Sequence, residues 1–362
     1  MNGMTPRPGI LDIAPYVPGN PLAGGPAKYL NLASNESAFG PSPRAREAYL
    51  AAAAEMHYYP DGGSTRLRHA IGQVHGLDPN RIVCGAGSDE LLTLLARGYA
   101  GPGDEILMSD HGFAMYPITT RSVGATPVAV PDKNLTTDVD GFLARVTPRT
   151  RLVFIANPNN PTGTYISAEE LTRLRAGLPE NVLLVIDAAY SEYVVRNDYT
   201  AGIELVDAAP NTVMTRTFSK IYGLAALRVG WAYCPPAIAD VLNRLRSPFN
   251  VGTPAQMAAV AAIEDVAAVD KARGHNDVWL PKFAADVAKL GLKAFPSVAN
   301  FLLVEFPADE KRGAKAANAF MQARGILLRP VGVYGLPRCL RITIGTEDEM
   351  RRLAAALAEF LA

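Results

Sequence analysis

The hydrophobic residues of this chain form short, uninterrupted runs. Three of them are R-L-V-F-I-A, N-V-L-L-V-I-D and N-T-V-M-T-R-T, at residues 151–156, 181–187 and 211–217. Runs of Leu, Val and Ile without polar alternation predict strands that are covered on both faces, and hence a parallel sheet with helices on either side. The predicted fold class is therefore α/β.

Polar residues follow these three runs. Asn160, Asp187 and Lys220 each come at or just beyond the carboxyl end of one run. Ligands bind at the carboxyl ends of the strands in open α/β sheets, so we expect these three side chains to meet in one crevice. Taken alone, an acid such as Asp187 at a strand end would more often cap a loop.

A glycine turn precedes one of the predicted helices. A short strand at 82–84 leads through Gly85 and Gly87 into a helix that begins at Ser88. Exposed amides at a helix N-terminus form a natural seat for a phosphate. A dinucleotide fingerprint is excluded, because Glu90 stands where the third glycine of that motif is required.

The hydrophobic pattern also predicts how the chain divides. Residues 1–30 are rich in Pro and Gly and are expected to form an arm that joins a small C-terminal domain. Residues 31–255, which include an expected helix at 44–56, form the large domain. Residues 256–362 form the small α+β domain, with helices near 277–290 and 311–324, a strand at 299–306, strands around 326–330 and 339–345, and a final helix.

Composition narrows the class of protein. Thirty-five Lys and Arg balance thirty-five Asp and Glu in 362 residues, which argues against nucleic acid or an anionic membrane as a partner. No apolar run approaches the roughly 20 residues that span a bilayer, and the N-terminus has no export signal, so a cytoplasmic location is expected. Cys84, Cys234 and Cys339 are expected to be reduced core thiols. The histidines show no metal-binding spacing, so no metal is expected.

The segment T-F-S-K-I-Y-G-L-A-A-L-R-V-G-W, at 217–231, holds the strongest chemical signal. Small and apolar neighbours disfavour the charged form of Lys220, which suits an amine nucleophile. Ser219 and Arg228 offer a hydroxyl and a planar charged fork, the donors that a phosphate prefers. An isolated Ser-Lys pair would equally well be an ordinary loop entering a helix.

The full pattern S-K-x-x-G-L-x-x-x-R-x-G resembles the lysine segment of pyridoxal-phosphate (PLP) enzymes of fold type I, the aspartate-aminotransferase-like fold. G-S-D-E-L, N-N-P-T-G, D-A-A-Y and C-L-R-I-T-I-G also match, so the resemblance extends from Asn31 to Gly345. Together the motifs resemble the histidinol-phosphate aminotransferase branch of the class II aminotransferases. The resemblance implies a large domain with a mostly parallel central sheet and a smaller C-terminal domain.

The resemblance also implies roles for individual residues. Lys220, Asp187 and Tyr190 would be catalytic: Lys220 binds PLP covalently and moves a proton, and Asp187 faces the pyridine nitrogen. Phe113, where many relatives have tyrosine, would stack on the ring, unless it is an ordinary core residue. Tyr59 would reach the cofactor phosphate of the neighbouring subunit, which implies a homodimer. The remaining cofactor-binding residues would be Asn160 and Tyr190 at the phenolic oxygen, and Ser88, Asp89, Thr217, Ser219 and Arg228 at the phosphate.

The same resemblance implies the substrates. Arg341 would bind the acceptor's carboxylate, and Arg329 with Tyr16 the anionic end of the donor. The expected reaction is transamination of L-histidinol phosphate with 2-oxoglutarate, in histidine biosynthesis. Phe113, and Ala188 where glutamate is frequent, leave two alternatives of the same fold open, an aromatic aminotransferase and a phosphothreonine decarboxylase. A non-enzymatic regulator would carry a winged helix-turn-helix before the PLP domain, whereas the first motif here begins at Asn31.

Overall fold

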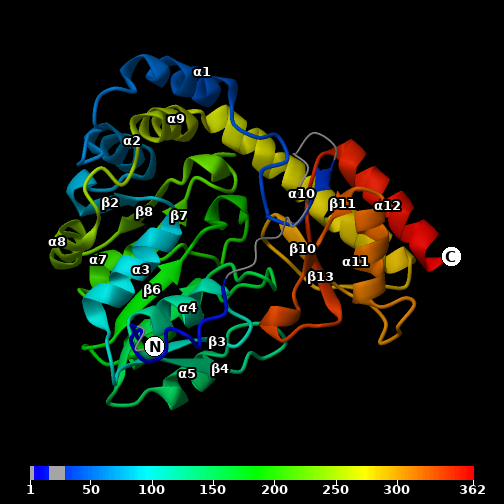
Figure 1. Ribbon diagram of the computed structural model, residues 1–362, viewed down its shortest axis with the longest axis horizontal. Coiled ribbons are helices and arrows are strands. Elements are labelled where there is room, and N and C mark those ends of the chain that lie inside the picture. Colours follow the sequence, from blue (N-terminus) through cyan, green and yellow to red (C-terminus); the bar gives the residue numbers. More distant parts are fainter. Residues whose placement is uncertain (1–3, 16–28) are drawn as a thin grey trace.

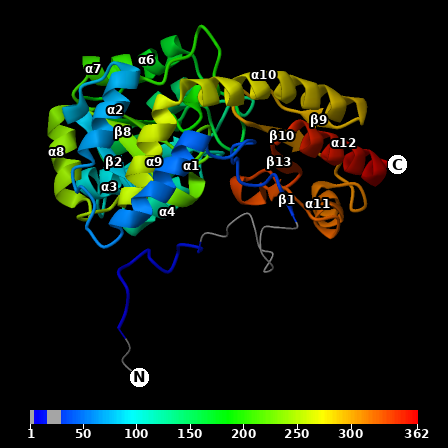
Figure 2. The ribbon, with the colours of Figure 1, turned by 90° about the horizontal axis from the view of Figure 1, so that it is seen from above.

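The protein is described here by a computed structural model that covers residues 4–15 and 29–362. It has a larger body built on a seven-stranded sheet and a smaller body built on a four-stranded sheet (Figure 1). The long helix α10 (Val266–Lys289) runs from the larger body across to the smaller one (Figure 2).

The seven-stranded sheet has the strand order β2-β8-β7-β6-β5-β3-β4. Neighbouring strands from β7 through β4 are parallel, whereas β8 is antiparallel to both β2 and β7. This arrangement confirms the predicted α/β class with a mostly parallel sheet. The strands are β2 (Ile82–Gly85), β3 (Glu105–Ser109), β4 (Thr126–Val130), β5 (Thr150–Ala156), β6 (Leu183–Asp187), β7 (Thr212–Thr217) and β8 (Gly230–Tyr233).

Helices cover both faces of this sheet. Successive residues of a strand point to opposite faces, so Leu152 and Phe154 pack under one layer of helices and Val153 and Ile155 under the other. The first layer consists of α3 (Ser88–Tyr99), α4 (Met115–Ser122) and α8 (Pro236–Leu245), and the second includes α5 (Val139–Arg145) and α6 (Ala168–Gly177).

A third hydrophobic cluster lies at the β2–β8–β7 side of the sheet, around the fully buried Trp231. It is formed with α1 (Pro43–Ala51), α2 (Thr65–His75), α7 (Ile203–Ala208) and α9 (Thr253–Glu264). The helix expected at 44–56 is therefore shorter than predicted, because its last residues form a 3₁₀ turn at Ala52–Glu55.

The smaller body holds an antiparallel sheet of order β12-β13-β10-β9. These strands are β9 (Lys293–Ala294), β10 (Phe301–Glu305), β12 (Arg329–Pro330) and β13 (Cys339–Thr343), and they pack with α10, α11 (Ala314–Ala323) and α12 (Glu347–Leu361). The helix predicted near 277–290 is the second half of α10. That helix begins at Val266, where the Asp265 side chain accepts a hydrogen bond from the Ala268 amide.

The chain enters the site from the smaller body. Strand β1 (Leu30–Asn31) pairs in parallel with β11 (Ile326–Leu327). The residues that follow β1 contact Lys220 and Tyr190 of the larger body and Arg341 and Thr343 of the smaller one.

The three cysteines are free and buried, as predicted. Burial raises the pKa of the Cys84 and Cys234 thiols to about 12 and that of Cys339 to about 11. In the part of the chain that the structure describes, no helix is both long and apolar enough to span a bilayer.

Candidate active site

The carboxyl ends of β5, β6 and β7 meet at one cavity of about 150 Å³. Asp187 is the last residue of β6, and Asn160 and Lys220 come a few residues after β5 and β7. The strand-end rule thus correctly predicted which side chains converge. Ten residues singled out from the sequence line this cavity: Ser88, Asp89, Phe113, Asn160, Asp187, Tyr190, Thr217, Ser219, Lys220 and Arg228.

Lys220 is hydrogen-bonded to the segment that follows β1. Its Nζ donates a hydrogen bond of 3.1 Å to the carbonyl oxygen of Ser34 and lies 5.6 Å from the centre of the Tyr190 ring. Gly223 allows the lysine loop this position: its φ is +68°, and a Cβ there would lie 2.3 Å from the carbonyl carbon of Gly40. Any larger residue would push the loop away from the segment that holds the lysine.

Asp187 is a buried carboxylate, and its side-chain partners among the described residues are hydroxyl groups, not cations. Tyr116 donates a hydrogen bond of 3.0 Å to its Oδ2, and Thr215 lies 3.5 Å from its Oδ1. Burial raises the pKa of Asp187 to about 6, although the Tyr116 hydroxyl opposes this shift. A carboxylate in such a setting would gain most from a cationic partner placed in the cavity.

Sequence reasoning missed Tyr116. It lies in α4, only three residues after Phe113, and its ring stacks on Phe154 with the centroids 4.8 Å apart. Phe113 meets the same tyrosine edge-on, at 5.7 Å. The helical spacing of these two aromatics was readable in H-G-F-A-M-Y-P, but the hydrogen bond to Asp187 spans 71 residues and leaves no local signal.

An anion cradle forms where α3 begins. Gly87 precedes the helix with φ +84°, and a Cβ on it would lie 2.3 Å from Arg228 Nη2. Arg228 also donates to Ser219 Oγ at 3.2 Å and approaches Asp89 at 3.4 Å. Backbone amides at a helix start, a hydroxyl and a guanidinium together suit a phosphate group.

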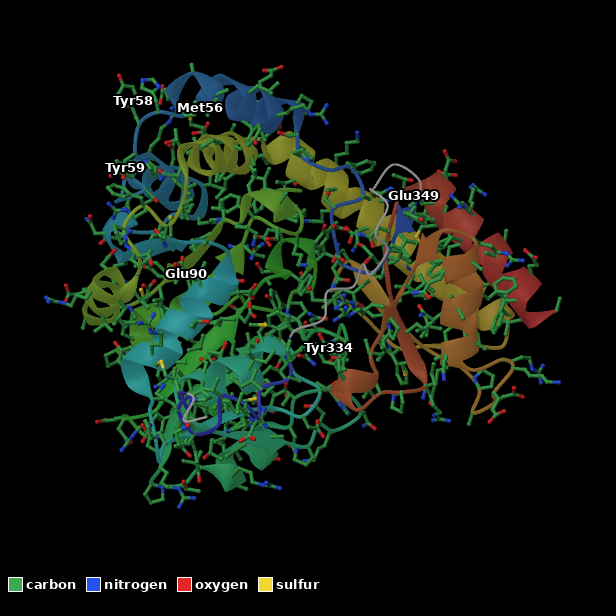
Figure 3. All side chains as sticks on the ribbon, in the orientation of Figure 1. Met56, Tyr58, Tyr59, Glu90, Tyr334 and Glu349 are labelled. Atoms are coloured by element: carbon green, nitrogen blue, oxygen red, sulfur yellow. The ribbon has the colours of Figure 1, made fainter. Side chains whose placement is uncertain are left out.

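Glu90, the residue that breaks the dinucleotide fingerprint, braces this cradle. Its Oε2 accepts from the Ala86 amide at 2.6 Å and from Asn250 Nδ2 at 2.7 Å. The carboxylate thus fixes the glycine turn and ties it to a loop 160 residues away (Figure 3 labels Glu90). No local motif indicates this role, because the contact with Asn250 spans 160 residues.

Two arginines of the smaller body lie opposite each other on β12 and β13. Arg341 donates to Asn160 Oδ1 and, at 2.6 Å, to the carbonyl oxygen of Ala33, which brings it to the rim of the strand-end cavity. Arg329 is its cross-strand neighbour and is only 9% exposed. Tyr16, the third expected substrate residue, lies outside the described residues.

Tyr59 does not reach the cavity of its own chain. It is 82% exposed, and its ring stacks on Phe249 at 4.6 Å (Figure 3). Tyr58 beside it is also exposed, at 69%.

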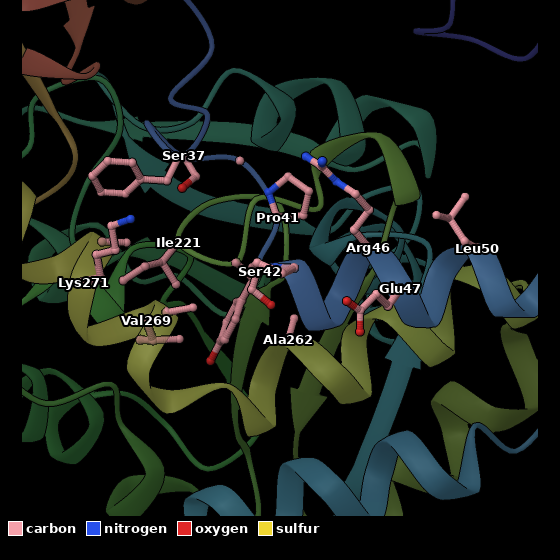
Figure 4. A pocket seen from close by; sticks show the side chains of 16 residues that line it. Ser37, Pro41, Ser42, Arg46, Glu47, Leu50, Ile221, Ala262, Val269 and Lys271 are labelled. Atoms are coloured by element: carbon pink, nitrogen blue, oxygen red, sulfur yellow. The ribbon is translucent and has the colours of Figure 1, made fainter. Parts of the chain in front are cut away.

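Two other cavities are larger than the strand-end cavity. One, of about 530 Å³, lies between α1 and the helices α9 and α10, with Ile221 in its wall and Arg46 and Lys271 at its edge (Figure 4). The other, of about 660 Å³, is lined by Arg329 and by residues 12–15. Neither has a buried carboxylate among its described lining residues. The strand-end cavity is therefore the candidate active site because of the residues that line it, although it is the smallest of the three.

Three side chains near β3 could hold a cation, which the sequence spacing did not indicate. Asp110, His111 and Asp132 bring their ligand atoms within 4.8 Å of one another. The Nδ1 of His111 already forms a 2.7 Å hydrogen bond with the carbonyl oxygen of Tyr334, which ties the β3–α4 loop to the smaller body.

Comparison with known proteins gives a consistent family. A family model described as aminotransferase class I and II matches residues 27–357. The chain is 58% identical to a histidinol-phosphate aminotransferase of Paramagnetospirillum magneticum, and the match covers 100% of this chain and 99% of that one. It is 59% identical to the histidinol-phosphate aminotransferase of Rhodospirillum centenum, with the same coverage.

Solved structures of aminotransferases also match this chain. The crystal structure of histidinol-phosphate aminotransferase from Sinorhizobium meliloti in complex with pyridoxal-5'-phosphate matches with a TM-score of 0.90 and 30% identity, over 99% of this chain and 98% of that one. Aspartate aminotransferase from Thermus thermophilus with maleate matches with a TM-score of 0.81 over 92% of each chain. At 23% identity, this second likeness bears on the fold alone.

The raised pKa of Asp187 predicts a pH dependence of stability in the cofactor-free protein. The folded protein keeps this proton to about pH 6, whereas the unfolded chain loses it near pH 4, so burial of Asp187 costs stability as pH rises through this window. Relative to wild type, Asp187→Asn should therefore gain about 2–3 kcal/mol in free energy of unfolding between about pH 4 and about pH 7.5.

Urea denaturation at the two pH values measures this difference. Asp240→Asn is the matched control, because the Asp240 side chain is 59% exposed and its removal should give little pH dependence. A gain for Asp187→Asn that is the same at both pH values would contradict the assignment of a buried, destabilised carboxylate.

Proposed function

Because the chain belongs to the aminotransferase class I and II family, we propose that it is a PLP-dependent histidinol-phosphate aminotransferase. It transfers the amino group of L-histidinol phosphate to 2-oxoglutarate, which yields imidazole acetol phosphate and glutamate, in histidine biosynthesis. The observation that carries this proposal is the convergence of Lys220, Asp187 and Arg228 on one cavity at the strand ends.

The residues present fit PLP. The cradle at the start of α3 needs an anion, the buried Asp187 needs a cation, and Lys220 offers an amine between them. Gly87 leaves room where a side chain would strike Arg228. When bound, PLP supplies an electron sink for the electrons released when the substrate's Cα loses its proton.

Each side chain then has a task at the cofactor. Asp187, which accepts a hydrogen bond from Tyr116, would keep the ring nitrogen protonated, and Phe113 would pack on the ring. Asn160 and Tyr190 bind the phenolic oxygen. The amides of Ser88 and Asp89 and the side chains of Thr217, Ser219 and Arg228 hold the phosphate.

Lys220 holds the cofactor at rest and moves the substrate's proton. With PLP bound, the Nζ of Lys220 would serve as the base that takes the proton from the substrate's Cα. The carbonyl oxygen of Ser34, 3.1 Å from this nitrogen, keeps the amine at the mouth of the cavity. Lys220 acts as the general base and acid of the reaction, with Asp187 and Tyr190 as the other catalytic residues.

Three residues bind the anionic groups of the substrates. Arg341 takes the carboxylate of 2-oxoglutarate and glutamate, and Arg329 with Tyr16 takes the phosphate of histidinol phosphate. A guanidinium accepts carboxylate and phosphate with the same planar fork, so one site serves both substrates in turn. The buried position of Arg329, beside Arg341 across the β12–β13 pair, supports this division.

The proposal extends to domains and location. The arm comprises residues 1–30, the large domain 31–255 and the small domain 256–362. Separate hydrophobic clusters in the two bodies support three such parts, as does the pairing of β1 with β11 at the end of the arm. The boundary at 255 falls inside α9 (Thr253–Glu264), whose buried residues pack with the large domain. The free, buried cysteines support a cytoplasmic location.

The enzyme acts as a homodimer in which Tyr59 binds the cofactor phosphate of the neighbouring subunit. The support is its position: Tyr59 and Phe249 form an exposed stacked pair, and neither lines the strand-end cavity of its own chain. The bond from Asn250 to Glu90 links the loop of Phe249 to the cradle of its own subunit.

Donor preference tests the proposed activity. Wild-type kcat/KM with 2-oxoglutarate should be higher for histidinol phosphate than for phenylalanine, because phenylalanine offers no second anion to Arg329. Loss of such a charged contact costs about 1.5–3 kcal/mol, so Arg329→Met should lower kcat/KM for histidinol phosphate by roughly 10- to 100-fold. The value for phenylalanine should change less than about threefold.

The matched control is Arg338→Met, which removes an arginine whose side chain is 57% exposed and should leave both donors unaffected. Equal use of both donors by the wild type would make the protein an aromatic aminotransferase. An equal loss for both donors in Arg329→Met would assign that arginine a structural role instead.

The dimer proposal predicts different effects for two adjacent tyrosines. Tyr59→Phe should weaken PLP binding by about tenfold, because it removes a hydrogen bond to a charged group, whereas Tyr58→Phe should not change it. Equilibrium titration of the apoenzyme with PLP measures both, and sedimentation of each variant checks that the dimer persists. Equal effects of the two substitutions, or a wild-type monomer, would refute the role of Tyr59.

A further inference from the structure

Three successive residues after β1 each contact a different side chain of the site. The carbonyl oxygen of Ala33 accepts from Arg341 at 2.6 Å, and that of Ser34 accepts from Lys220 at 3.1 Å. The third residue, Asn35, uses its side chain: its Nδ2 donates to the Tyr190 hydroxyl at 2.9 Å. The first two contacts are made by backbone, so Asn35 is the only one of the three whose contact a substitution can remove directly.

Thr343 fixes which way the Asn35 amide faces. Thr343 Oγ1 accepts the backbone N–H of Asn35 at 2.9 Å, which leaves its own proton free to donate to Asn35 Oδ1, at 3.2 Å. In this arrangement the Oδ1 atom faces Thr343 and the NH₂ group faces Tyr190. Asn35 has φ +57°, a left-handed conformation that asparagine tolerates better than most residues.

The contact from Asn35 determines what the Tyr190 hydroxyl can do. A hydroxyl that accepts a hydrogen bond on one side keeps its own proton for a partner elsewhere. Among the described residues no acceptor is recorded for that proton, and Tyr190 lines the strand-end cavity. An edge-on contact with Phe301, at 5.2 Å, holds the ring in place. The proton of Tyr190 is thus directed into the cavity.

We propose that Asn35 is a positioning residue that makes Tyr190 a hydrogen-bond donor toward the cofactor. This inference rests on the proposed function, since it concerns what Tyr190 offers to PLP. Asn35, Tyr190 and Thr343 are at most 3% exposed, so water cannot readily take over any of these bonds.

The contacts of Asn35 also join the two bodies of the protein. Thr343 lies on β13, two residues after Arg341, and Asn300 Nδ2 donates to the carbonyl oxygen of Asn35 at 3.1 Å. Both partners belong to the smaller body, whereas Tyr190 follows β6 of the larger one. The direction of the Tyr190 proton is therefore set by the strand that carries Arg341.

The visible absorbance of the PLP-loaded enzyme reports this effect. A donor at the phenolic oxygen disperses negative charge and weakens the hold of that oxygen on a neighbouring proton. The absorbance changes with pH as this proton is lost from the bound cofactor. If Tyr190 no longer donates to the phenolic oxygen, the proton is held more tightly, so the pH at the midpoint of the change rises. Asn35→Asp has the same shape but cannot donate when ionised, so Tyr190 would donate to it instead; the expected rise is about one pH unit.

A double-mutant cycle with Tyr190→Phe separates two effects of Asn35→Asp: the changed orientation of the Tyr190 hydroxyl and the added negative charge. The added charge of Asn35→Asp acts in both backgrounds, whereas the orienting effect needs the tyrosine hydroxyl. The midpoint should therefore rise by at least about half a unit more in the wild-type background than in Tyr190→Phe. Asn35→Gly, which is uncharged and keeps the left-handed backbone, should raise the midpoint in the same sense in the wild-type background only.

Equal shifts in the two backgrounds, or no shift with either substitution, would overturn the role of Asn35. Should Asn35→Asp fail to fold or to bind PLP, the Asn35→Gly pair decides by the same comparison. A wild-type protein that develops no visible band with PLP would instead overturn the proposed function, and this inference with it.

Discussion

A buried carboxylate at the end of a central strand sets the requirements of this site. Parallel strands place the carboxyl ends of β5, β6 and β7 side by side, and β6 ends in Asp187. Burial raises the pKa of this carboxyl to about 6, and its hydrogen-bond partners among the described residues are hydroxyls and a backbone amide. Burial of such a charge is expensive, so a cationic group in the cavity would stabilise the ionised form.

Both bodies of the protein contribute side chains to the site. The larger one provides the anion cradle and Lys220, while the smaller one provides Arg341 and, through Thr343, the orientation of Asn35. Residues 33–35 contact Arg341, Lys220 and Tyr190 in turn. This one segment therefore fixes side chains of both bodies relative to one another. Arg341, the proposed substrate arginine, therefore lies on the same strand as Thr343, which contacts Asn35.

Much of this arrangement was predictable, because it follows from local rules. Uninterrupted apolar runs predicted parallel strands, and the strand-end rule then predicted that Asn160, Asp187 and Lys220 would meet. What the sequence did not reveal depends on contacts between distant positions. The bond from Tyr116 to Asp187 spans 71 residues, and that from Asn35 to Thr343 spans 308.

Other misses have equally physical causes. The start of α10 was placed too late, because its first half contains Gly274, a residue that weakens helical patterns. Tyr59 could be assigned a partner only through the family resemblance, since its predicted contact lies on another chain. The substrate role of Arg329 remains a prediction for a related reason: its cavity is shared with the start of the chain, where Tyr16 lies outside the described residues.

The most direct test of the account is to identify the lysine that binds PLP. Incubation of the protein with PLP, reduction with borohydride and peptide mass spectrometry would fix the cofactor where it binds. We expect one phosphopyridoxyl group per chain, on Lys220. Exposed lysines such as Lys133 or Lys271 should carry much less of the label. Label spread over exposed lysines, with Lys220 unmodified, would contradict it.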